Sequence, residues 1–151
     1  MIDSSTRWQS KYLKSISASY GKFPHFKEFF PALEKILLKN QKHLAALNLE
    51  LIILLKDYFK IDTPCFTASD IVKTELTGSD LILELCLTLG ANIYMSGPDG
   101  KNYLKLEKFK EFGIEVVFHD YEHPVYPQKH GDSFIPYLSA CDYIFNNGGV
   151  I

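Results

Sequence analysis

Two polar stretches of this chain contain residue types that suit ligand binding or catalysis. In the first, Ser96, Lys101 and Asn102 supply hydroxyl, ammonium and amide groups that suit a phosphate or a carboxylate. Gly97 and Gly100 permit tight turns and a close approach of the backbone to a ligand. The candidate ligand-binding residues of this stretch are Ser96, Gly97, Gly100, Asn102 and Tyr103, and Lys101 is a candidate catalytic residue. The pattern of this stretch alone favours a proline-glycine β-turn that carries a solvated lysine over a ligand loop.

The second stretch begins at Tyr121 and combines histidine, tyrosine, proline and glutamine. His123 is a candidate acid–base catalyst because an imidazole titrates near neutral pH. Tyr126 and Gln128 could frame a flat polar ligand such as a base or a sugar. Two structural alternatives stay open, because His123 could instead orient the loop and tyrosine rings often pack against prolines.

Three further groups of residues have both a functional and a structural interpretation. Asp142 and Asn146 lie four residues apart, on one side of a predicted helix, and could bind a ligand or hold the preceding loop. A metal site is not expected, because Pro124 disfavours the helix that would align His119 with His123. The possible metal ligands are His119, Asp120, Glu122, His123, His130 and Asp132. On the first predicted helix, a solvated face is preferred over an anion site for Lys11, Ser15, Tyr20 and Lys22.

The composition is that of one globular domain with a sizeable core. The 151 residues are 46% hydrophobic and 14% aromatic, which excludes a disordered or fibrous chain. A formal net charge of -2 argues against a general nucleic-acid binder. The cysteines at 65, 86 and 141 have apolar neighbours, as buried free thiols do, which favours a reducing cytoplasm. No run reaches the length of a membrane span, and no motif identifies a cofactor.

The hydrophobic patterns predict an α/β fold with a helical N-terminal half. We expect a small, mostly parallel sheet of about three strands at 65–68, 92–95 and 114–118, with flanking helices at 79–89, 104–112 and 137–145. Loops that follow parallel strands open at one edge of the sheet, so Lys101 and His123 should approach one cleft.

The N-terminal half is predicted to contain two long helices. Ser4 or Ser5 could cap the first, which ends at Gly21 and carries a stripe of Trp8, Tyr12, Ile16 and Tyr20. Residues 23–31 are rich in aromatics and proline, and predict only a short helical turn. The second long helix, 41–58, is apolar around most of its surface and should be mostly buried. Ser79 or Asp80 should cap the next helix, which ends at Gly90.

The order of these motifs resembles the WbqC-like family of bacterial proteins. The resemblance rests on residues 8–26, on Leu89-Gly90-Ala91, on Tyr94 to Leu104, on Gly113-Ile114, on His123-Pro124-Val125-Tyr126-Pro127-Gln128, and on Gly131, Phe134, Pro136, Leu138-Ser139, Asp142 and Phe145-Asn146. Family members usually begin with a further segment that opens with a strand, so this chain resembles the C-terminal portion of a larger domain. Members often carry a lysine where this chain has Gly78.

The resemblance implies a role in bacterial surface polysaccharide (O-antigen) biosynthesis. The expected ligand is a nucleotide-linked or phosphorylated small molecule, and the expected chemistry, if any, is a transferase reaction of nucleotidyl, glycosyl or acyl class. Lys101 would then stabilise phosphate charge, His123 would move a proton, and Tyr126 and Gln128 would orient the acceptor. The alternative is a non-catalytic binding or assembly module, or a fragment that needs a partner segment and self-associates.

Overall fold

The computed structural model describes residues 1–3, 5–129 and 133–149. Within them the chain forms two compact units, one made of residues 1–63 and 123–151 and the other of residues 64–122. The first unit is therefore discontinuous in sequence, and the second is an insertion within it. No helix among the described residues is both long and apolar enough to cross a bilayer.

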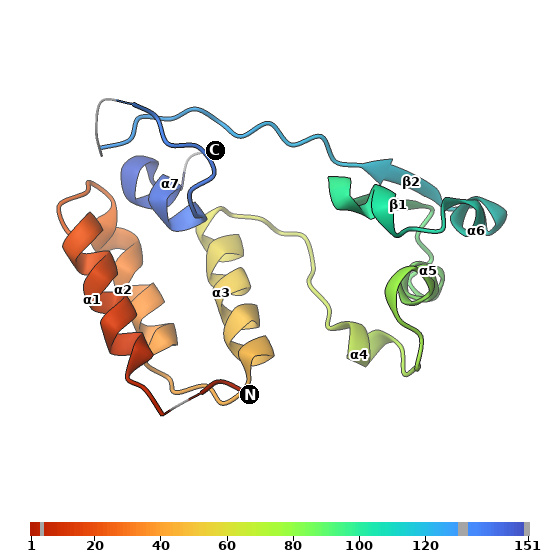
Figure 1. The fold of residues 1–151 in the computed structure, drawn as a ribbon, viewed down its shortest axis with the longest axis horizontal. Helices are drawn as coiled ribbons and strands as arrows, with labels where there is room; N and C mark the ends of the chain where they lie inside the picture. The colour runs from red at the N-terminus through yellow and green to blue at the C-terminus, as the bar shows by residue number, and fades with distance from the viewer. Residues whose placement is uncertain (4, 130–132, 150–151) are drawn as a thin grey trace. The chain divides into compact units, whose positions relative to one another are not determined.

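The first unit is built from four helices, which group together in Figure 1: α1 (Trp8–Tyr20), α2 (Phe26–Leu37), α3 (Leu44–Tyr58) and α7 (Ala140–Asn147). The centre of its core is Phe145, which is fully buried and lies within 6.1 Å, between ring centroids, of the rings of Tyr20, Phe26 and Phe29. Full burial of one such side chain contributes about 1.5–3 kcal/mol. The last helix thus completes the core that the first three helices begin. The core residues are Leu13, Ile16, Phe23, Phe29, Phe30, Leu33, Leu37, Leu47, Ile144 and Phe145.

The helices of this unit differ from the sequence predictions in several respects. The residue before α1 is Arg7, and no side chain caps the helix; Ser5 is not a cap, and Ser4 lies outside the described residues. Gly21 does follow the end of α1, as predicted. Tyr12 is 50% exposed, and Leu13 takes its expected place in the core.

The prediction of a short turn at 23–31 was wrong, because α2 continues for 12 residues with Pro31 inside it. Proline removes one backbone donor, but four apolar side chains on one face of α2 are buried, and this packing outweighs the loss. The prediction that α3 is mostly buried was also wrong. Only Leu47 is buried, while Leu44, Leu49, Ile52 and Ile53 are 40–56% exposed, because one face of α3 alone meets the core.

The second unit contains a parallel pair of strands, β1 (Ile93–Ser96) and β2 (Glu115–Phe118), with Ile93 opposite Glu115 and Ser96 opposite Phe118. The expected α/β fold with flanking helices is confirmed, but with two strands among the described residues instead of three. The strand predicted at 65–68 is absent, since residues 65–67 are exposed and no strand of the described residues pairs with them. The short helix α4 (Ala68–Ile71) follows instead. Cys65 is exposed, contrary to prediction, while Cys86 is buried.

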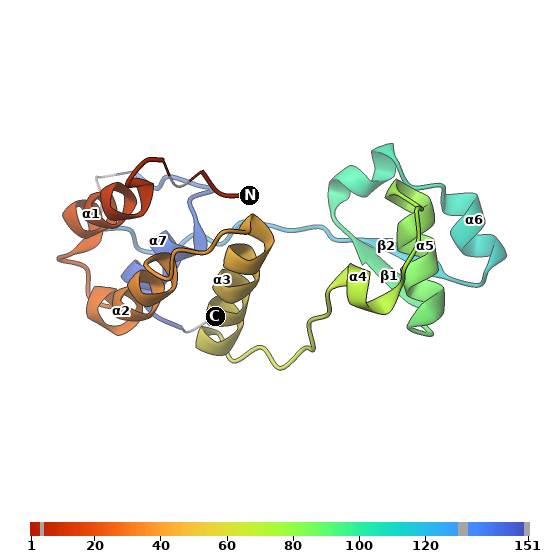
Figure 2. The same cartoon turned by 90° about the horizontal axis from the view of Figure 1, so that it is seen from below.

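Helices α5 (Gly78–Thr88) and α6 (Leu106–Glu111) and the 3₁₀ helix η1 (Pro98–Asn102) accompany the strands, as Figure 2 shows. Their shared core consists of Leu83, Cys86, Leu104, Phe109 and Ile114. Thr77 precedes α5, so neither Ser79 nor Asp80 is its N-cap. Ser79 instead accepts a hydrogen bond of 2.9 Å from the backbone of Lys105. Gly90 ends the helix region as predicted, with a φ of 64° in the left-handed conformation.

Candidate functional site

The candidate ligand loop follows β1 directly and lies beside the end of β2. The backbone N–H of His119, the first residue after β2, donates to the carbonyl of Ser96 at 2.8 Å. Because the strands are parallel, the beginnings of both predicted loops meet at the carboxyl edge of the sheet, which is where α/β sheets bind ligands.

The loop is a 3₁₀ helix, and Gly100 fits where a larger residue would not. A Cβ atom at Gly100 would lie 2.1 Å from the hydroxyl oxygen of Ser96 and 3.0 Å from a methyl carbon of Leu104. Ser96 is 3% exposed, and its hydroxyl donates to the carbonyl of Gly97 at 3.1 Å. Ser96 and Gly100 therefore shape the turn from inside, whereas Asn102 and Tyr103 are exposed.

Lys101 is the cation of this loop, and it lies over an aromatic ring. Its ammonium nitrogen is 5.3 Å from the centroid of the Phe118 ring, a cation–π distance that keeps the charge at the sheet edge. Lys101 is exposed, and no carboxylate of the described residues is within ion-pair distance of it. By contrast, Asp80 takes ion pairs of 2.6 and 2.9 Å from Lys105 and Lys108, whose hydrogen bonds hold its pKa below the usual value. Lys101 is thus a cation of the second unit that is available to an anion.

The second predicted stretch lies mostly in the first unit and is organised around Asp142. This carboxylate, 1% exposed, accepts hydrogen bonds from the hydroxyls of Tyr20 at 3.0 Å and Tyr126 at 2.8 Å, and from the amide of Gln128 at 3.3 Å. Burial, and then the hydrogen bond to Asp142, raise the pKa of Tyr20 to about 12. Polar groups predicted to bind a ligand therefore bind one another.

Gln128 and Asn146 attach the same loop to the rest of the unit. The side-chain amide of Gln128 both donates to the carbonyl of Ile135 and accepts from its N–H, each at 2.8 Å. Asn146 accepts from the N–H of Lys129 at 2.9 Å and donates to the carbonyl of Asp142 at 2.8 Å. These contacts match the structural alternative considered for Asp142 and Asn146, in which they hold the preceding loop.

His123 lies among aromatic rings at the start of this loop. Its ring centroid is 6.1 Å from that of Tyr126, 5.9 Å from that of Phe134 and 5.1 Å from that of Tyr137. The ring nitrogen Nδ1 is 2.9 Å from the carbonyl oxygen of Pro124. Tyr137 is 80% exposed and has a φ of 61°, a left-handed conformation that bulky residues rarely adopt. This conformation explains why the last helix begins at Ala140 and not at 137 as predicted.

The site residues are divided between the two units. Lys101 belongs to the second unit and His123 to the first, so their shared cleft stays a prediction. Of the possible metal ligands, His130 and Asp132 lie outside the described residues, as does Gly131 of the loop motif. The described part of the chain contains no cluster of three or more metal-ligating side chains. Sequence reasoning missed Phe118 and Tyr137. It also missed Arg7, just before α1, and Ser10 and Lys14 on α1, which line a hollow with Lys11 and Ser15.

Comparison with known proteins identifies relatives of the chain. It is 29% identical over 145 residues to an uncharacterized protein, Rv1507c, of Mycobacterium tuberculosis, a match that covers 95% of this chain and 62% of the mycobacterial protein. The chain thus spans less than two thirds of the length of that curated relative. No solved structure matches it. The sequence pattern of the WbqC-like protein family matches residues 1–150, nearly the whole chain, and the protein therefore belongs to the WbqC-like family.

Proposed function

We propose that this WbqC-like protein binds a nucleotide-linked or otherwise phosphorylated small molecule, in the assembly of bacterial O-antigen or another surface polysaccharide. The phosphate would lie against residues 96–103, with Ser96, Gly97 and Gly100 forming the turn and Asn102 and Tyr103 at its exposed rim. The observation that carries the proposal is the exposed ammonium group of Lys101, held 5.3 Å above the Phe118 ring at the carboxyl edge of the parallel strands. The described residues give this exposed ammonium group no carboxylate partner, which favours an external anion.

The enzymatic form of this proposal is a transferase. In it Lys101 offsets phosphate charge, His123 moves a proton, and Tyr126 and Gln128 orient the acceptor. The class of group transferred is open.

A specific observation favours the second candidate, a non-catalytic binding or assembly module. Tyr126 and Gln128 use polar atoms to bind Asp142, and Gln128 also binds the backbone of Ile135. Groups engaged in this way hold a loop in place, and would have to exchange partners before they could orient an acceptor. This candidate keeps the phosphate-binding role of Lys101 and omits the chemistry.

Calorimetric titration with UDP and a panel of UDP-sugars tests the phosphate-binding proposal. Replacement of Lys101 by alanine should weaken binding by about tenfold, equivalent to ~1.4 kcal/mol. The same change should leave the free energy of unfolding within about 0.5 kcal/mol, as for an ordinary surface residue.

Lys110→Ala is the matched control, because Lys110 is an exposed lysine of the same unit that lines a hollow with Gly113 and Glu115, at the start of β2 instead of its end. It should leave binding unchanged. Absence of binding by the parent protein, or equal binding by Lys101→Ala, would show that the loop is a structural turn. Transfer of a group from a bound UDP-sugar, lost on replacement of His123 by alanine, would separate the transferase from the non-catalytic module.

A further inference from the structure

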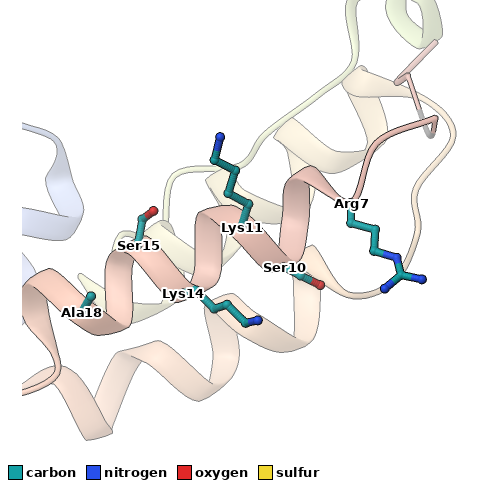
Figure 3. A pocket seen from close by; sticks show the side chains of 6 residues that line it. All are labelled: Arg7, Ser10, Lys11, Lys14, Ser15 and Ala18. Atoms are coloured by element: carbon teal, nitrogen blue, oxygen red, sulfur yellow. The ribbon is translucent and has the colours of Figure 1, made fainter.

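The outer face of α1 carries a shallow hollow lined with basic and hydroxyl side chains. Figure 3 shows the side chains of Arg7, Ser10 and Lys14 on one flank of the helix and those of Lys11 and Ser15 on the other. Ala18 completes the lining, and the hollow has a volume of about 630 Å³. These positions recur every three or four residues, so they form one continuous helix face. All six are exposed.

The N-terminal segment that contains this helix face, residues 4–27, is opposite in net charge to the remainder of the chain. Residues 4–27 contain five lysines and arginines and no acidic residue. The whole sequence has 16 basic and 18 acidic residues, so the remainder has 11 basic and 18 acidic residues. The net charges are therefore +5 for the segment and -7 for everything else. Positive charge is therefore concentrated in this segment, and such a concentration attracts anions locally although the chain as a whole is acidic.

The three cations of the hollow lack acidic neighbours. Among the residues with assigned positions, no carboxylate lies within ion-pair distance of Arg7, Lys11 or Lys14. Glu34 lines an adjoining hollow between α1 and α2, together with Lys14, but not this one. Like charges one helical turn apart destabilise a helix, and a bound anion would relieve that repulsion.

We propose that this face of α1 binds a compact polyanion with two or three linked phosphate groups. A helix rises 1.5 Å per residue, which separates the backbones of Arg7 and Lys14 by about 10 Å. Three flexible cations along that length suit a diphosphate or triphosphate, and the hydroxyls of Ser10 and Ser15 can donate to its oxygens. The proposal does not depend on the Lys101 loop, which belongs to the other unit.

Two other anionic partners fit these features less well. An anionic membrane surface is bound by helices that insert large apolar side chains, and the only apolar side chain in this hollow belongs to Ala18. A nucleic acid extends far beyond one helix face, and the net charge of -7 on the remainder of the chain would repel it.

Calorimetric titration of the full chain with orthophosphate, pyrophosphate and tripolyphosphate tests the proposal. Affinity should rise with the number of phosphate groups and fall as salt is added. The double variant Lys11→Gln with Lys14→Gln should bind tripolyphosphate at least tenfold more weakly. The matched control is Lys35→Gln with Lys42→Gln, which removes the same charge from exposed positions of the same unit outside residues 4–27 and should change the affinity less than twofold. Unchanged circular dichroism spectra will show that both variants are folded.

Three results would overturn the inference: no binding of tripolyphosphate, equal weakening by the two double variants, or loss of binding in Lys101→Ala alone. The last result would leave the proposed function standing, since it would locate the phosphate at the sheet edge. Parallel titrations with phosphatidylglycerol vesicles and with a single-stranded oligonucleotide complete the test. The proposal would also be contradicted if the protein bound the vesicles or the oligonucleotide through Lys11 and Lys14 but did not bind tripolyphosphate.

Discussion

Replacing the buried carboxylate of Asp142 should strongly destabilise the protein. In Asp142→Ala, the hydroxyl of Tyr126 loses a buried hydrogen bond to a carboxylate, and a hydrogen bond to a charged group contributes about 1.5–3 kcal/mol. Tyr20 is partly exposed and can bond to water, while the amide of Gln128 keeps the carbonyl of Ile135, so each of these adds less. The loss in stability is partly offset, because the variant no longer has to bury a charged carboxylate. We therefore expect the free energy of unfolding to fall by about 2–4 kcal/mol, a large fraction of the roughly 5–15 kcal/mol that is usual for native proteins.

Urea unfolding followed by circular dichroism measures this loss. Asp57→Ala is the control, because Asp57 is an exposed aspartate of α3 in the same unit, and its replacement should cost less than about 0.5 kcal/mol. Combining Asp142→Ala with Tyr126→Phe forms a double-mutant cycle, in which the two costs should fail to add by at least about 0.5 kcal/mol. A loss within 0.5 kcal/mol for Asp142→Ala, or strictly additive costs, would refute the account of the network.

Three further outcomes are expected. A methyl group at Gly100 would lie 2.1 Å from the hydroxyl oxygen of Ser96, so Gly100→Ala should lower the free energy of unfolding in urea by about 1–3 kcal/mol. Gly97→Ala is the control and should be nearly neutral, because no atom lies within 4 Å of the added carbon. Because the pKa of Tyr20 is raised to about 12, its un-ionised form is the one that the fold favours, so stability should fall as pH rises from about 10 to 12, and less steeply in Tyr20→Phe. Cys86→Asp should cost several kcal/mol in thermal unfolding because it buries an unpaired carboxylate, and Cys65→Asp, at an exposed position, should not; equal effects would contradict the assigned burial.

The parts of the fold that were predictable depend on local patterns. The short apolar runs that became β1 and β2 are bounded by glycine and polar residues, and their parallel pairing follows from the helix between them. Residues 65–68 have a similar composition but no partner strand, which local sequence does not reveal. Pro31 marked a helix break by local rules, yet the buried face of α2 overrides it.

The candidate site was predictable as a set of residues but not as a set of contacts. The four-residue spacing of Asp142 and Asn146 correctly suggested that they could hold a loop. Tyr20, which donates to Asp142, is 122 residues from it in sequence, and no spacing rule joins positions so far apart. The place of Phe118 beneath Lys101 likewise follows from strand register, which only the folded sheet fixes.

The discontinuity of the first unit has a consequence for synthesis on the ribosome. Helices α1 to α3 are complete once Tyr58 has been made, but their core lacks Phe145 until roughly 90 more residues have followed, which takes about 4–18 s at the usual 5–20 residues per second. During that interval the aromatic side chains around the missing ring are open to water and to other nascent chains. The inserted unit has its own core and can fold in the meantime. The amount of folded protein in the cell should therefore depend on how fast residues 63–145 are translated, and on whether chaperones bind helices α1 to α3 before Phe145 is made.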